Sequence, residues 1–253
     1  IVEGKVDGTT FATLSNRSVS GGTNYSNWGG NLLGEAQTTG DWFFDDIAIN
    51  DNSGGSQNSY PGSGKIIRLK PNAAGDVNTF ATAVGGTAGA ANNFTRVNEI
   101  TQDDATTYNA DVTLNNEDLF NCENSGIGAS DTVNVVAVHS RFANLVSADA
   151  TTAIKFEILK ASGGTKTQSA AVIPNSTTWR PNGATAPRLF PIIQYVDPDG
   201  GVWTQVTLDS MQIGYIISAA GVQTIGVTEV SAIVDYTPAV VSSTVNTLSL
   251  KGA

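Results

Sequence analysis

Residues 153–160 read AIKFEILK, and this stretch decides the fold class. The apolar side chains of Ile154, Phe156 and Ile158 fall on one face of an extended chain, and the charged side chains between them fall on the other. A period of two is typical of a β-strand with one buried face. The stretch therefore predicts a strand that packs its aliphatic and aromatic face against a core.

Further strand patterns surround this one in the second half of the chain. They cover residues 132–142, 166–173, 188–196, 212–217 and 226–236. The last of them places Thr228, Val230, Ala232, Val234 and Tyr236 on one face. One short helical turn, with Leu208 and Met211 three residues apart, is expected before the strand at 212–217. So many short strands predict an all-β protein, specifically a β-sandwich or jelly roll.

The first half of the chain is less regular. Residues 1–14 predict two strands joined at an Asp-Gly turn, and KIIRLKP predicts a short strand near residue 65. The isolated aromatic residues of 71–131 are too widely spaced for one helix face, so we expect an extended crossing there. The predicted division has four parts: an N-terminal partial jelly-roll segment (1–50), an extended connector with short strands (51–131), a β-sandwich domain (132–238), and a tail or arm (239–253).

Composition excludes several classes of protein. The 253 residues include 13 basic and 23 acidic side chains, a net charge of −10, and no segment concentrates Lys or Arg, so phosphate-driven binding of nucleic acid is not expected. The single cysteine, Cys122, excludes an intrachain disulfide. No apolar run is long enough for a membrane span and no leader pattern opens the chain. Because the first residue is Ile1, either processing or an incompletely recorded N-terminus is expected.

The residue inventory also argues against an enzyme. The only histidine, His139, shares a strand face with Val135 and Ala137, so we interpret it as a core or rim residue. One histidine and one cysteine cannot build a zinc site, and no Gly-x-Ser-x-Gly elbow is present. The acids that could cleave a glycosidic bond are Asp45, Asp46, Asp103, Asp104, Glu117 and Asp118. Adjacent aspartates on a strand point to opposite faces, so neither Asp45 with Asp46 nor Asp103 with Asp104 makes an acid–base couple by itself.

Residues 43–51, FFDDIAIND, place two aspartates inside an apolar strand. A buried carboxylate is costly unless it is hydrogen-bonded, paired or metal-bound. This stretch resembles the final strand of concanavalin A-like and carbohydrate-binding-module jelly rolls. In calcium-binding members an aspartate of that strand helps to hold a structural calcium, so the resemblance implicates Asp45 or Asp46. No other cofactor is expected.

A longer run of segments carries a second resemblance. Residues 41–80, followed by VNEITQDDATTY (97–108) and VWTQVTLDSMQIGYII (202–217), resemble the order of segments in a group of tailed-bacteriophage structural proteins of the virion, tail-fibre or head-decoration type. That group has a lectin-like jelly roll before a second β-sandwich. Only the end of such a jelly roll fits into residues 1–50, so either its first part is missing or a neighbouring subunit completes the sheet.

The resemblance implies a non-enzymatic structural protein of a viral particle, a capsid decoration or fibre-type component located in the virion or outside the cell. Its partners would be other copies of itself and other virion proteins, with no nucleic acid and no membrane. The alternative is a lectin-like module that binds a carbohydrate or receptor, with a host-surface glycan as ligand. Aromatic rings near turns are the candidate sugar platforms: Trp28, Tyr60, Trp179 and Trp203.

Overall fold

The computed structural model describes residues 2–6, 9–14, 64–101, 103–147, 151–174, 176–181 and 190–239. The chain divides into two compact units, Ile1–Ser63 and Gly64–Ala253. In the first unit, β1 (Val2–Val6) and β2 (Thr9–Leu14) pair antiparallel. Val6 lies opposite Thr9, which leaves two residues for the turn and confirms the predicted hairpin.

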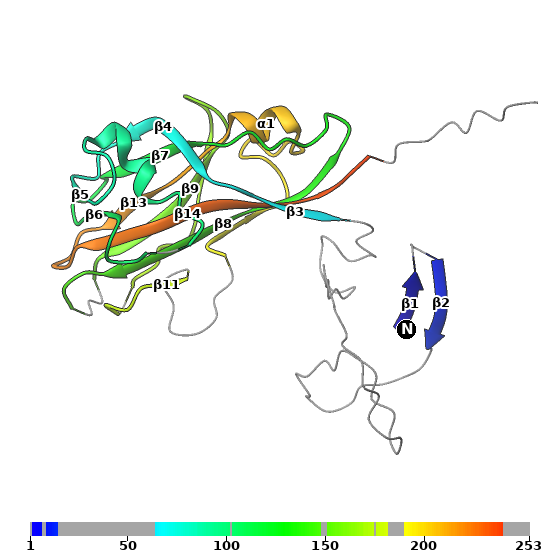
Figure 1. Ribbon diagram of the computed structural model, residues 1–253, viewed down its shortest axis with the longest axis horizontal. Helices are drawn as coiled ribbons and strands as arrows, with labels where there is room; N and C mark the ends of the chain where they lie inside the picture. Colours follow the sequence, from blue (N-terminus) through cyan, green and yellow to red (C-terminus); the bar gives the residue numbers. More distant parts are fainter. Residues whose placement is uncertain are drawn as a thin grey trace, which may run out of the picture. The chain divides into compact units, whose positions relative to one another are not determined.

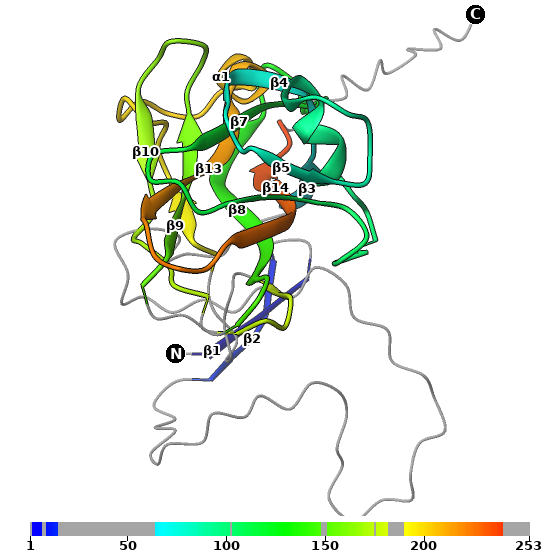
Figure 2. The same ribbon diagram turned by 90° about the vertical axis from the view of Figure 1, so that its left-hand side faces the viewer.

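The second unit is a sandwich of two antiparallel sheets, which confirms the predicted all-β class (Figure 1, Figure 2). Sheet I contains, in spatial order, β10 (Lys166–Gln168), β9 (Ala153–Leu159), β13 (Gln212–Ala219), β7 (Glu117–Cys122) and β4 (Pro71–Asn78). Sheet II contains, in spatial order, β11 (Arg180–Pro181), β8 (Thr132–Asn144), β14 (Ile225–Thr237), β6 (Tyr108–Asp111) and β5 (Thr82–Val84). In addition, β12 (Ile192–Gln194) pairs with β8 and β3 (Lys65–Leu69) pairs with β14.

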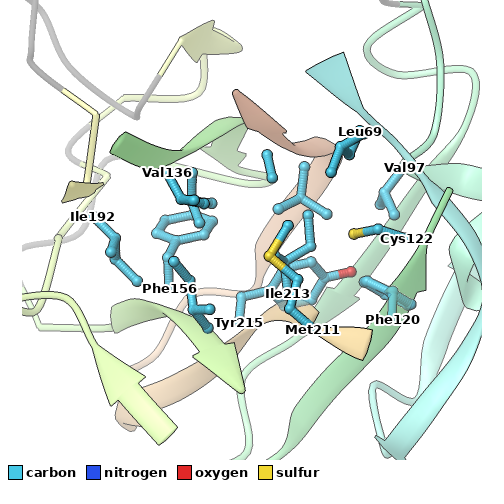
Figure 3. Close-up of a cluster of buried hydrophobic side chains, with 14 of the residues drawn as sticks. Leu69, Val97, Phe120, Cys122, Val136, Phe156, Ile192, Met211, Ile213 and Tyr215 are labelled. Atoms are coloured by element: carbon cyan, nitrogen blue, oxygen red, sulfur yellow. The ribbon is translucent and has the colours of Figure 1, made fainter. Parts of the chain in front are cut away.

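The core lies between the two sheets, and β9 contributes the face that its alternation predicts. Ile154, Phe156 and Ile158 are all fully buried. From the facing sheet, Phe142 of β8 meets Phe156 with ring centroids 5.1 Å apart. Figure 3 shows Phe156 beside Val136, another core residue of β8. Burial of such side chains stabilises the fold by about 1.5–3 kcal/mol each.

The described residues between 64 and 131 are part of the sandwich, so the predicted connector is wrong from residue 64 onward. Strands β3 to β7 join both sheets, and the compact unit begins at Gly64. These strands are short or irregular: β5 has three residues, and the pairing of β4 with β7 shifts register twice. β4 reads PNAAGDVN, in which small and polar residues hide the strand pattern.

The last strand, β14, follows its predicted alternation only in part. Val230, Ala232 and Val234 are buried core residues. Before them the pairing with β8 shifts register at Thr228, so Val227 also enters the core. A bulge of this kind adds one residue to a strand and exchanges the faces on either side of it. Thr228, the added residue, donates its hydroxyl to the carbonyl oxygen of Thr107 at 2.9 Å.

The predicted helical turn is confirmed as α1 (Gln205–Ser210). Thr204 caps its N-terminus: its hydroxyl accepts from the Thr207 N–H at 3.2 Å, and the Thr207 hydroxyl accepts from the Thr204 N–H at 2.8 Å. A second helix, the 3-10 helix Ala90–Arg96, precedes β6. Neither these helices nor any other within the described ranges is long and apolar enough to cross a membrane. Of the predicted arm, only Ala239 is described, and its N–H donates to Asp131 at 2.8 Å.

Candidate functional site

Several predicted site residues fall on parts of the chain that the structure does not describe. These are the two candidate calcium ligands, Asp45 and Asp46, and two candidate sugar platforms, Trp28 and Tyr60. The calcium site and these two platforms therefore stay predictions. Within the described ranges, no three His, Cys, Asp or Glu side chains come together as a group that could hold a metal ion.

Trp203 is not a sugar platform, which corrects the prediction. Only 4% of it is exposed, and it belongs to the core cluster between the sheets. The turn from Asp197 to Gly201 closes with a backbone hydrogen bond of 2.8 Å, and the helix cap begins at Thr204, directly after the tryptophan. These two local structures leave the ring directed inward, so it offers no face to a ligand.

Trp179 occupies a different position, on the outer face of sheet II. It is partly exposed, and its ring lies 5.4 Å from that of Tyr108, with an angle of 47° between the ring planes. A Cβ atom built on Gly226 would lie 2.7 Å from the Cη2 atom of Trp179, so the indole sits over that glycine. The structure therefore brings a predicted platform residue together with a second aromatic ring.

An ion pair lies on the same face of sheet II. The Arg141 guanidinium donates to both carboxylate oxygens of Asp104, at 2.5 and 2.8 Å. Both side chains are partly exposed, and the bond to Asp104 raises the pKa of Arg141 against the effect of burial. A bidentate pair of this kind fixes the orientation of both groups.

Next to this pair, a buried carboxylate gathers two basic side chains. Glu229 Oε1 lies 2.6 Å from Arg68 Nη2 and 3.1 Å from His139 Nδ1. His139 also packs edge-on against Phe190, with centroids 6.1 Å apart. The histidine is partly exposed and bonded to a carboxylate, which agrees with its interpretation as a rim residue.

On the outer face of sheet I the structure joins two carboxyl groups that the sequence keeps apart. Glu117 of β7 and Glu157 of β9 are both buried, and they lie on the two sides of β13, which pairs with both of these strands. Burial, and then a hydrogen bond that the protonated Glu157 carboxyl donates to Glu117, raise the pKa of Glu157 to about 7. Lys166 forms an ion pair with Glu117 and lies 3.5 Å from Glu157.

This carboxyl pair was missed at the level of sequence, because Glu157 stands on the polar side of a regular strand and nothing marks its burial. Chemically, two directly hydrogen-bonded carboxyls share a proton. The two carboxyls of a glycosidase instead stand about 5–9 Å apart on either side of a sugar. The pair and its lysine are therefore suited to holding strands together.

The neighbouring acid, Asp118, points into the core, as expected for adjacent residues of one strand. Its carboxylate accepts the Phe80 N–H at 3.1 Å and the Asn93 side-chain amide at 2.8 Å. Burial raises the pKa of Asp118 to about 7, and these hydrogen bonds oppose the rise. Arg96 in turn donates to Asn93 at 3.1 Å, so the network fixes the 3-10 helix on sheet I.

A last charged group closes the turn after β12. Lys160 Nζ lies 2.8 Å from Asp197 Oδ2 and 2.7 Å from Asp199 Oδ2. The other oxygen of Asp197 accepts the N–H groups of Asp199 and Gly201, each at 2.9 Å. The bond to Lys160 lowers the pKa of Asp197.

A scan against models of protein families finds no match for this chain, and a search of curated proteins finds none either. The fold by itself defines an all-β protein with a two-sheet sandwich.

Proposed function

We propose that this chain is a non-enzymatic structural component of a viral particle, a capsid decoration or fibre-type protein that acts through assembly of its subunits. The observation that carries the proposal is the end of sheet II formed by β3, β14, β8 and β12. In the described part of the chain, β3 and β12 are edges, since each pairs with one strand only. Unpaired edges are ready templates for strands of another chain.

Apolar side chains on the outer face of this end support the proposal. Ile66 of β3 lies opposite Asp235 and is 65% exposed. Ile193 of β12 is 36% exposed. It lies opposite Ala137 of β8, and Ala137 in turn lies opposite Ile233 of β14. Residues directly opposite one another share a face of the sheet, and so do Ile233 and Asp235, which are two residues apart in β14. The two exposed isoleucines therefore stand on the same face of sheet II. Burial of one such side chain in a subunit contact contributes about 1.5–3 kcal/mol.

The charged clusters support the non-enzymatic part of the proposal. Glu117, Asp104 and Asp197 each form an ion pair with a Lys or Arg within the fold. A carboxylate held in this way is committed to a structural contact and is poorly placed for proton transfer.

The test is the assembly state of the full chain, measured by sedimentation velocity over a range of concentrations. We expect oligomers, and we expect Ile66→Asp with Ile193→Asp to shift them toward monomer at an unchanged melting temperature. Val222→Asp is the matched control, because this valine is 81% exposed and precedes the opposite end of β14. Mass spectrometry of purified particles should detect the chain. A monomer at all concentrations that is absent from particles would overturn the proposal.

A further inference from the structure

The outer face of sheet II contains a row of positions with little or no side chain. Gly226 of β14 lies opposite Ala110 of β6 on one side and Ala143 of β8 on the other. Ile225 and Val227 point into the core, so this row faces outward. Both alanines are nonetheless buried, because other groups cover the row.

Trp179 is one of the groups that cover this row. A Cβ atom at Gly226 would lie 2.7 Å from Trp179 Cη2 and 2.6 Å from Leu145 Cδ2. Only glycine therefore lets the indole cross the sheet as far as Tyr108. The next residue, Asn109, points inward and donates its amide to the Tyr215 hydroxyl at 3.0 Å, which fixes the strand that carries Tyr108. Trp179 and Tyr108 thus form a preorganised aromatic pair.

The Arg141–Asp104 pair lies beside the two rings. Tyr108 precedes Asn109, which pairs with Val227, and Arg141 pairs with Glu229. Tyr108 and Arg141 therefore flank β14 on its two sides, at the bulge formed by Thr228. The hydroxyl of Thr228 holds the carbonyl oxygen of Thr107, so the bulge also positions the loop from which Asp104 reaches Arg141. Two of the five guanidinium N–H groups bind Asp104, and the partly exposed carboxylate keeps acceptor capacity.

We infer that this cluster, Tyr108, Trp179, Arg141 and Asp104, is a binding site for a neutral oligosaccharide. A pyranose ring presents an apolar face of C–H groups and an edge of hydroxyls that both donate and accept. The aromatic pair matches the face, and the oriented carboxylate and guanidinium match the edge. The net charge of −10 disfavours polyanionic ligands such as nucleic acids and sulfated glycans.

The test measures binding of the full chain to three probes, maltohexaose, cellohexaose and chitohexaose, by isothermal titration calorimetry. We expect at least one to bind, and we expect Trp179→Ala to weaken that binding at least about tenfold. Gly226→Ala should weaken it similarly without removing a ring, because its Cβ displaces the indole. Tyr108→Ala gives the same information should Gly226→Ala fail to fold, which circular dichroism would reveal.

Tyr195→Ala is the matched control. This tyrosine is 47% exposed and follows β12, which pairs with residues 136–138 of β8, away from the Trp179 cluster. The control should bind the probe as the wild type does. Absence of binding to all three probes would overturn the inference, and so would binding that survives Trp179→Ala. The assembly-deficient Ile66→Asp, Ile193→Asp variant should keep its binding to the oligosaccharide, so this inference and the proposed function can fail separately.

Discussion

The buried carboxyl of Asp118 makes stability depend on pH in a direction opposite to that of most carboxylates. Its pKa is about 7 in the folded protein against 3.8 for a free aspartate. The folded state therefore binds the proton more tightly than the unfolded state between these values, and the free energy of unfolding falls as pH rises. The stabilising contribution is complete below pH 3.8 and is lost once pH passes about 7.

The magnitude follows from the width of this window. From pH 4.5 to 7, one proton held only by the folded state lowers the free energy of unfolding by about 3 kcal/mol, since each pH unit corresponds to about 1.4 kcal/mol. Glu157, with a pKa also raised to about 7 by burial and by Glu117, adds a loss of the same sign. Asp197 behaves in the opposite way, because Lys160 lowers its pKa. Its contribution to the free energy of unfolding is lost only as pH falls below the ordinary pKa of an aspartate, and this lies outside the window from about pH 4.5 to 7.

The assay is urea unfolding followed by fluorescence at pH values from about 4.5 to 8.5, which span the window. As pH rises over this range, the free energy of unfolding of Asp118→Asn should fall by about 3 kcal/mol less than that of the wild type. The new amide nitrogen faces the Asn93 amide, which carries a cost that does not vary with pH, so the slope is the readout. Asp131→Asn, at a carboxylate whose pKa is lowered by backbone hydrogen bonds, should keep the wild-type slope. A wild-type stability that is flat or rising, or an equal slope in Asp118→Asn, would refute this reasoning.

Four other substitutions or treatments test the fold. Phe156→Ala should lower the free energy of unfolding by about 3–5 kcal/mol in urea titrations, because it opens a cavity between the sheets. Thr204→Ala should cost about 1 kcal/mol in the same assay by removing the cap of α1; no loss would contradict the capping role. Gly214→Ala should abolish soluble expression or lower the melting temperature sharply, because its Cβ would overlap the carbonyl oxygen of Asp118. Cys122, whose thiol pKa is raised to about 12 by burial, should react with a thiol reagent in urea and not in the native protein.

The sequence was informative where a strand is regular and one of its faces is covered by the other sheet. The alternation of residues 153–160 identified the three core residues of β9. It could not identify the burial of Glu157 on the opposite face, because that burial depends on Lys166 and Glu117, which come from other strands. Alternation assigns a side chain to a face and does not tell what covers that face.

The two tryptophans with described side chains show a second limit. Trp179 and Trp203 both lie near turns, yet one lies on the outer face of sheet II and the other in the core. The position of Trp179 depends on Gly226, a glycine far along the chain from it. The position of Trp203 depends on the helix cap at Thr204, the next residue. The former contact is nonlocal, so no local pattern around Trp179 could have predicted it. The membership of β4 to β7 in the sandwich was not predicted for a related reason, since these strands are held by pairing with distant strands and not by their own propensity.

The turn after β12 has one more consequence. Its sequence, Asp197-Pro198-Asp199-Gly200, has the spacing of oxygen ligands found in calcium loops, and the Lys160 ammonium lies between the two carboxylates. This cation is covalently attached, so dilution and chelators cannot remove it. The turn should therefore keep its conformation when EDTA is present.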